Sequence, residues 1–150
     1  MSQQFYVIVR RKEDKKEIAT LDYVCGCGDY QDILSNNIVF DDNFEHIVEQ
    51  QDEQLLKAIR ELEYKQEILL ENFKANLNNI QTNTLLLSNA KTKDIGTEYQ
   101  ETIDETKSSL IENIEDNYSL IYHLTLMLNR AMSATFTVDK NYEIVICWSN

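Results

Sequence analysis

The chain has 150 residues and a formal net charge of −12, from 14 Lys and Arg against 26 Asp and Glu. This charge argues against direct binding to nucleic acid or to an anionic membrane, and the length fits a single domain. Residues 1–17 lack the apolar region of a signal peptide, and no apolar run approaches the roughly 18 residues of a membrane span, so we expect a cytoplasmic protein without a transmembrane segment.

Residues 5–24 have the pattern of a β-hairpin. Apolar residues line both faces of the first strand and return in the second, after a charged turn at residues 12–16. Gly26 and Gly28 then end the hairpin, because glycine permits the positive φ of a sharp turn. We predict a β head over residues 1–40, whose ambiguous last part, residues 30–40, fits a short helix followed by a short strand.

The longest periodic segment is residues 41–93, and it predicts a long helix. Asp42 with Glu45 matches a capping box, and no proline or glycine interrupts the next roughly 50 residues, a length of about 75 Å. Such a helix needs a partner helix to cover its apolar side. Its heptad steps of four and three define a seam that we predict to be an interface: Leu55, Ile59, Leu62, Leu69, Phe73 and Ile80.

Polar residues also fall on this seam, at Gln66, Asn76 and Asn83. They either fix the register and the number of partner helices, or they mark a wetter and weaker helical segment near the tip. The sequence leaves both interpretations open, and with them the continuity of the helix.

A second long helix is predicted over residues 97–133, after a turn at residues 88–96. The short connection implies an antiparallel helical hairpin, similar to a coiled coil. A C-terminal β-hairpin is expected over residues 134–150. Because the ends of such a helical hairpin return to the same place, we predict an α+β fold in which the N-terminal and C-terminal hairpins form one small antiparallel sheet.

Candidate chemistry is sparse. Cys25, Cys27 and Cys147, with a histidine, could form a zinc site if the two hairpins are adjacent, but a lone Cys-x-Cys is a weak signal and small buried residues beside a glycine turn are the simpler interpretation. His46 and His123 have no identifiable catalytic partner in their own segments. We therefore predict neither an enzyme nor a bound cofactor.

Two charged features invite binding hypotheses. An acidic row with helical spacing on the second long helix either imitates a nucleic-acid backbone or is a solvated face: Glu98, Glu105, Glu112 and Asp116. A basic tip on the first hairpin either binds a small anionic ligand or an acidic helix of a neighbouring subunit, or simply protects a sheet edge: Arg10, Arg11, Lys12, Lys15 and Lys16.

The leading functional interpretation is a non-enzymatic protein-interaction or assembly module that forms homo-oligomers through its long helices. One alternative is an inhibitor or sequestering protein that uses the acidic row or the basic tip. The abundance of Ile, Asn, Glu and Lys fits an AT-rich genome, including that of a virus. A second alternative is a small metalloprotein.

Overall fold

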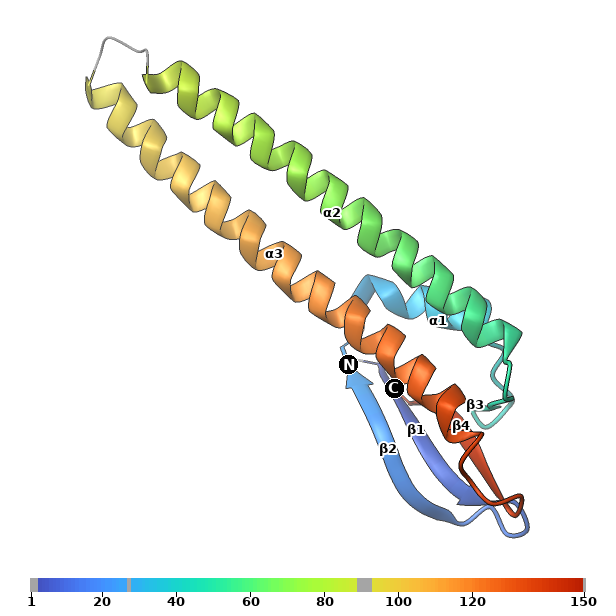
Figure 1. Cartoon of the computed structure of the whole chain (residues 1–150). Helices are drawn as coiled ribbons and strands as arrows, with labels where there is room; N and C mark the ends of the chain where they lie inside the picture. The colour runs from blue at the N-terminus through green and yellow to red at the C-terminus, as the bar shows by residue number, and fades with distance from the viewer. Residues whose placement is uncertain (1–2, 27, 89–92, 150) are drawn as a thin grey trace. The chain divides into compact units, whose positions relative to one another are not determined.

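The computed structural model describes residues 3–26, 28–88 and 93–149, with side chains described except at residues 29, 83–88 and 93–99 (Figure 1). The chain divides into two compact units. The sheet unit comprises Met1–Tyr64 and Leu120–Asn150, and the helical unit comprises Lys65–Ser119.

A four-stranded antiparallel sheet belongs to the sheet unit, with the strand order β2, β1, β4, β3. Its strands are β1 (Gln4–Arg11), β2 (Glu17–Cys25), β3 (Glu45–Ile47) and β4 (Tyr142–Ser149). Phe5 of β1 lies opposite both Val24 of β2 and Trp148 of β4. The predicted α+β fold, with N-terminal and C-terminal strands in one sheet, is therefore confirmed.

The C-terminal end differs from the predicted hairpin in one respect. Residues 135–138 form turns instead of a strand, and the amides of Thr137 and Val138 both donate to the Ala134 carbonyl at 3.1 Å. β4 therefore has no strand directly before it. It pairs with β1 and with β3, which lies in a segment that the sequence analysis assigned to a helix.

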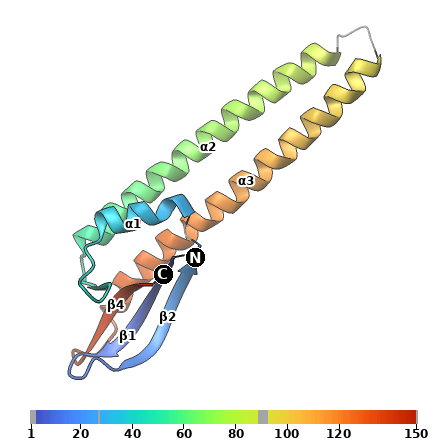
Figure 2. The same cartoon turned by 180° about the vertical axis from the view of Figure 1, so that it is seen from behind.

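The helical elements are the 3-10 turn η1 (Gly28–Tyr30), α1 (Gln31–Asn37), α2 (Glu53–Ser88) and α3 (Lys93–Ala134). The α2 and α3 segments run antiparallel within each unit, which confirms the helical hairpin (Figures 1 and 2). α2 begins at Glu53 and not near Asp42, because the carboxylate of Asp52 accepts hydrogen bonds from the amides of Gln54 and Leu55 at 3.1 and 3.2 Å.

The main core lies on one face of the sheet. Phe5, Val7, Ile144 and Ile146 point to this face and are at most 1% exposed. In both views α1, the start of α2 and the end of α3 lie alongside the sheet (Figures 1 and 2). These helices contribute fully buried side chains of their own: Leu34, Leu55, Leu62, Leu124 and Leu128. Burying apolar area stabilises the folded chain by about 25 cal/mol per Å². Because the fully buried apolar side chains are concentrated here, this core is the main source of stability.

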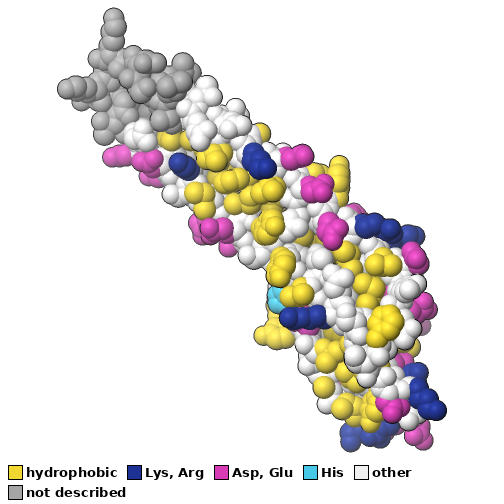
Figure 3. Space-filling model, in the orientation of Figure 1, with side chains coloured by type: hydrophobic (Ala, Val, Ile, Leu, Met, Phe, Trp, Pro, Cys, Tyr) yellow, Lys and Arg dark blue, Asp and Glu magenta, His cyan; other side chains and the backbone are white. Residues whose placement is uncertain are grey.

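The helical unit has no comparable core. Among its described side chains, at residues 65–82 and 100–119, none is buried. Its apolar heptad residues are partly exposed: Leu69, Phe73, Leu77, Ile80, Ile103, Leu110 and Ile114. Apolar side chains also form a visible stripe on the face drawn in Figure 3. No described helix contains an apolar segment of the length that a membrane span requires.

Candidate interaction surface

The predicted seam is divided between the two units. Leu55, Ile59 and Leu62 belong to the sheet unit and are buried there, so another chain cannot contact them unless the core opens. Leu69, Phe73 and Ile80 belong to the helical unit and remain partly exposed. Only this second half of the seam is placed where a partner helix could cover it.

The helical unit exposes further apolar side chains beside the seam. Leu70 is 38% exposed, Ile111 is 39% exposed and Tyr118 is 42% exposed. Ile111 and Tyr118 are seven residues apart on α3, so they lie on the same side of that helix. Together with the outer half of the seam, Leu70, Ile111 and Tyr118 form the helical patch, which is the candidate interaction surface.

The acidic row lies on the same helix. Glu105, Glu112 and Asp116 are exposed, and no ion pair joins them to another residue in the part of the chain whose side chains are described. Glu98 lies outside the described side chains. Between Gln100 and Ser119, α3 carries six acids and one lysine, so this helix holds a large share of the negative charge.

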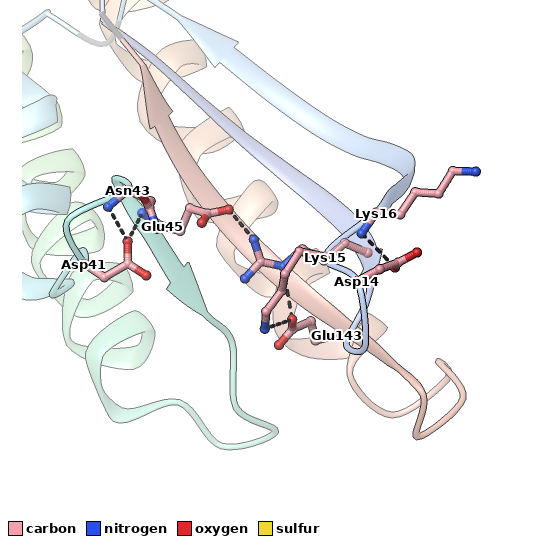
Figure 4. Close-up of polar contacts among 8 residues, drawn as sticks. Asp14, Lys15, Lys16, Asp41, Asn43, Glu45 and Glu143 are labelled. Atoms are coloured by element: carbon pink, nitrogen blue, oxygen red, sulfur yellow. Dashed lines mark hydrogen bonds and ion pairs between the residues drawn. The ribbon is translucent and has the colours of Figure 1, made fainter.

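The basic tip is largely neutralised by the chain's own carboxylates. Arg10 Nε donates to Glu143 Oε1 at 3.1 Å, Arg10 also pairs with Glu45, and Lys15 Nζ lies 2.9 Å from Glu143 Oε1 (Figure 4). The side chains of Arg10 and Glu143 are each 7% exposed. A buried charge requires a partner, so this ion network of Arg10, Lys15, Glu45 and Glu143 is structural.

Of the remaining residues of the basic tip, Lys12 and Lys16 are exposed and Arg11 is partly exposed. Arg11 pairs with Asp14 at 3.1 Å, whereas Lys12 and Lys16 form no ion pair with any described residue. Lys12 also lines an open pocket of about 530 Å³, together with Lys140, Glu49 and Asp139. Glu143 lines the pocket as well, so three carboxylates face two lysines and the electrostatics of the pocket do not favour an anion.

The ion network lies on the second face of the sheet, beside a small apolar cluster, because Arg10 and Glu143 are each two residues from a member of that cluster. Ile8, Val145 and Cys147 are buried there, and Tyr6 packs against them. Burial, together with the nearby Glu45 carboxylate, raises the pKa of the Cys147 thiol to about 11. For Glu143, burial raises the pKa, but the hydrogen bonds from Lys15 and Arg10 outweigh it and place the pKa below its ordinary value.

The predicted metal ligands are not assembled in the described residues. Cys25 is exposed at the end of β2 and Cys147 is buried on β4, with β1 between the two strands. Cys27 lies outside the described part of the chain. Within that part, no group of three or more His, Cys, Asp or Glu side chains could hold a metal ion.

Both histidines have partners that their own segments did not reveal. His46 Nε2 lies 2.7 Å from Asp52 Oδ2, and its Nδ1 lies 3.1 Å from the Val39 carbonyl oxygen. Both partners are acceptors, so both contacts are hydrogen bonds only when each ring nitrogen carries a proton. His123 lies 3.3 Å from Asp22 of β2, which also pairs with Arg130 at 3.7 Å.

Asp52 is the residue that the sequence analysis missed. It is 3% exposed and holds His46, the Glu49 amide and the first turn of α2 together. Burial raises its pKa, but the hydrogen bonds from His46 and from the backbone outweigh this, so the pKa lies below its ordinary value. An aspartate just before the first apolar heptad residue, Leu55, was the available signal.

These contacts stabilise the fold and supply no nucleophile paired with a base. Comparisons of the chain with protein-family models, with curated proteins and with solved structures gave no match. The functional argument therefore depends on the surfaces described above.

Proposed function

We propose that this protein is a non-enzymatic assembly module whose helical unit pairs with the helical unit of a second copy. One observation carries this proposal: none of the described side chains of the helical unit is buried, although apolar residues occupy most of its heptad positions. A pair of helices covers each apolar stripe from one side only. Two such pairs together form a four-helix bundle, in which the remaining side is also covered.

The charge distribution is compatible with this pairing. Glu105, Glu112 and Asp116 are exposed, whereas Leu110 and Ile114 of the same helix are partly covered, so acids and seam residues lie on different sides. The acids nevertheless repel those of a second copy. Because salt screens exposed charges, we expect self-association to strengthen as ionic strength rises. We also propose a cytoplasmic setting, where the free thiols Cys25 and Cys147 remain reduced.

Light scattering coupled to size-exclusion chromatography tests the proposal over a range of protein concentrations. The native chain should form a dimer or larger species at micromolar concentration and dissociate on dilution. Ile111→Glu should weaken this association, because it places a charge in the helical patch. The matched control is Ser109→Glu, which adds the same charge at an exposed position pointing away from Ile111. A native chain that stays monomeric at the highest concentration contradicts the proposal.

The acidic row supports a second candidate function, in which it occupies the cationic surface of a nucleic-acid-binding protein. The supporting observation is that Glu105, Glu112 and Asp116 are exposed and have no cationic partner among the described side chains. The test compares capture of nucleic-acid-binding proteins by the native chain and by a variant with Glu105→Gln, Glu112→Gln and Asp116→Asn. Equal capture by the two chains removes this candidate.

A further inference from the structure

The open edge of the sheet has the features of a second contact surface. β2 is a nine-residue edge strand that pairs only with β1 among the described strands, and its first five residues are exposed. The opposite edge strand, β3, has only three residues. A short edge offers few free backbone groups to another strand, whereas a long one offers a row of them. The two edges of this sheet therefore differ in their capacity to pair.

Two bulges in β2 turn apolar side chains outward. The register with β1 shifts between Val7 and Ile8 and again between Val9 and Arg10, which leaves Leu21 and Ile18 without partners. Leu21 is 43% exposed and Ile18 is 49% exposed, and Tyr23 on the same strand is 58% exposed. A bulge by itself disfavours pairing at an edge, and edges that avoid pairing usually carry charges as well, whereas these positions carry large apolar side chains. Large apolar residues there indicate a surface that becomes covered.

The charges around β2 do not oppose a second copy. Lys16 and Glu17 stand together at the start of the strand, and Asp22 pairs with His123 and Arg130 of α3. This balance contrasts with α3 between Gln100 and Ser119, where acids dominate. For a chain with a net charge of −12, the β2 edge is thus a place where two identical surfaces meet with little repulsion.

We propose that β2 pairs antiparallel with β2 of a second copy, so that the two sheets become one continuous sheet. A strand related to its neighbour by a two-fold axis offers identical backbone donors and acceptors, so the contact is self-complementary. Pairing also covers Ile18, Leu21 and Tyr23 of both copies. The occupant of the edge is therefore a second copy of this chain.

This contact uses no residue of the helical unit, so it does not depend on the proposed function. If both contacts form, each copy has two different two-fold surfaces. Two such surfaces carry the assembly beyond a dimer, into a closed dihedral oligomer or an open chain. The native protein then forms species larger than a dimer as its concentration rises.

The decisive experiment removes the helical contact first. In the Ile111→Glu background, light scattering should show a dimer, and adding Leu21→Lys should halve the mass to that of a monomer. Adding Val39→Lys instead is the matched control, because Val39 is 70% exposed and lies outside β2. A monomer with Ile111→Glu alone overturns the edge contact and leaves the helical proposal intact. A dimer that survives Leu21→Lys also overturns the edge contact.

Hydrogen exchange provides a readout that does not depend on mass. In the Ile111→Glu chain, the amides of Glu17–Cys25 should exchange more slowly at high than at low protein concentration. The Leu21→Lys variant should lose this dependence while its circular dichroism spectrum stays native. Exchange in β2 that is independent of concentration in the Ile111→Glu chain contradicts the pairing of two β2 edges.

Discussion

The sheet unit and the helical unit use the same long helices in different ways. In the sheet unit Leu62 of α2 is fully buried, whereas Leu69, at the equivalent heptad position in the helical unit, is partly exposed. The sheet unit adds further elements to the two helices, namely the sheet, with buried Phe5 and Ile146, and α1, whose Asn37 contacts Glu61 beside Leu62. A heptad pattern therefore predicts a helix and its apolar side, but not what covers that side.

The units also differ in how they treat charge. The sheet unit buries Arg10 and Glu143 and neutralises them within the chain. The helical unit keeps Glu105, Glu112 and Asp116 exposed. Part of the charge in the sheet unit is thus built into the fold, whereas all described charged side chains of the helical unit are exposed and available to modulate association.

The largest expected effect comes from breaking the ion network. Arg10→Ala should lower the free energy of unfolding by about 3–5 kcal/mol, because it leaves Glu143 buried with one fewer cationic partner. The neighbouring Arg11 pairs with Asp14 at the surface, so Arg11→Ala should change it by less than about 1 kcal/mol. Urea unfolding of the two variants measures both. Equal losses would show that the network is not more important than a surface ion pair.

The next prediction compares the two units by making the same change, leucine to alanine, at one position of α2 in each unit. Leu62→Ala should lower the free energy of unfolding by about 2–5 kcal/mol, because it opens a cavity in a closed core. Leu69→Ala should lower it by roughly 1 kcal/mol in dilute solution, because water already reaches this position.

Protein concentration separates burial within one chain from burial in an assembly. The loss caused by Leu69→Ala should grow at concentrations where the helical units pair, and the loss caused by Leu62→Ala should stay constant. Urea unfolding at two protein concentrations measures how the loss caused by each variant changes. A loss for Leu69→Ala that equals the loss for Leu62→Ala in dilute solution would mean that the helical unit has a closed core after all.

Local patterns predicted much of this fold. The heptad steps indicated both long helices, and their antiparallel return placed the N-terminal and C-terminal strands in one sheet. The charged turn at residues 12–16 correctly separated β1 from β2. These features depend on residues near one another in the sequence, or on the geometry of a helical hairpin, so they can be inferred from one chain.

The errors arose where distant residues decide the structure. Residues 45–47 fit the start of a helix by local pattern, but they pair with β4 and become β3. Arg10 looked like an available cation, but its partner Glu143 lies 133 residues away. Leu55 and Leu62 looked like interface residues because the sequence shows an apolar side without showing which elements of the same chain cover it.

A smaller effect tests where the sheet unit passes into the long helix. Asp52→Ala should lower the free energy of unfolding by about 2 kcal/mol, because the amides of Gln54 and Leu55 lose their cap and His46 loses its acceptor. Asp42→Ala is the control: Asp42 is exposed, and we expect a change of less than about 0.5 kcal/mol. Thermal unfolding compares the two variants. A larger loss of stability with Asp42→Ala than with Asp52→Ala would instead support a helix that begins near Asp42, as the capping-box pattern predicted.

The smallest expected effect concerns the ionisation of Glu143 in the sheet unit. Glu143→Gln keeps the shape and one acceptor oxygen, so at neutral pH it should destabilise the chain by only about 1 kcal/mol.

The pKa of Glu143 is lower in the folded chain than in the unfolded chain. Its carboxylate therefore stabilises the fold at pH values above the ordinary pKa, which is near 4. This contribution disappears as the pH falls through the folded pKa. The difference between the native chain and Glu143→Gln should therefore shrink on acidification below about pH 4, as urea unfolding at several pH values can show. If the difference stays constant down to pH 2, then shape and not charge explains the burial of Glu143, and the contrast between buried charge in one unit and exposed charge in the other loses its energetic meaning.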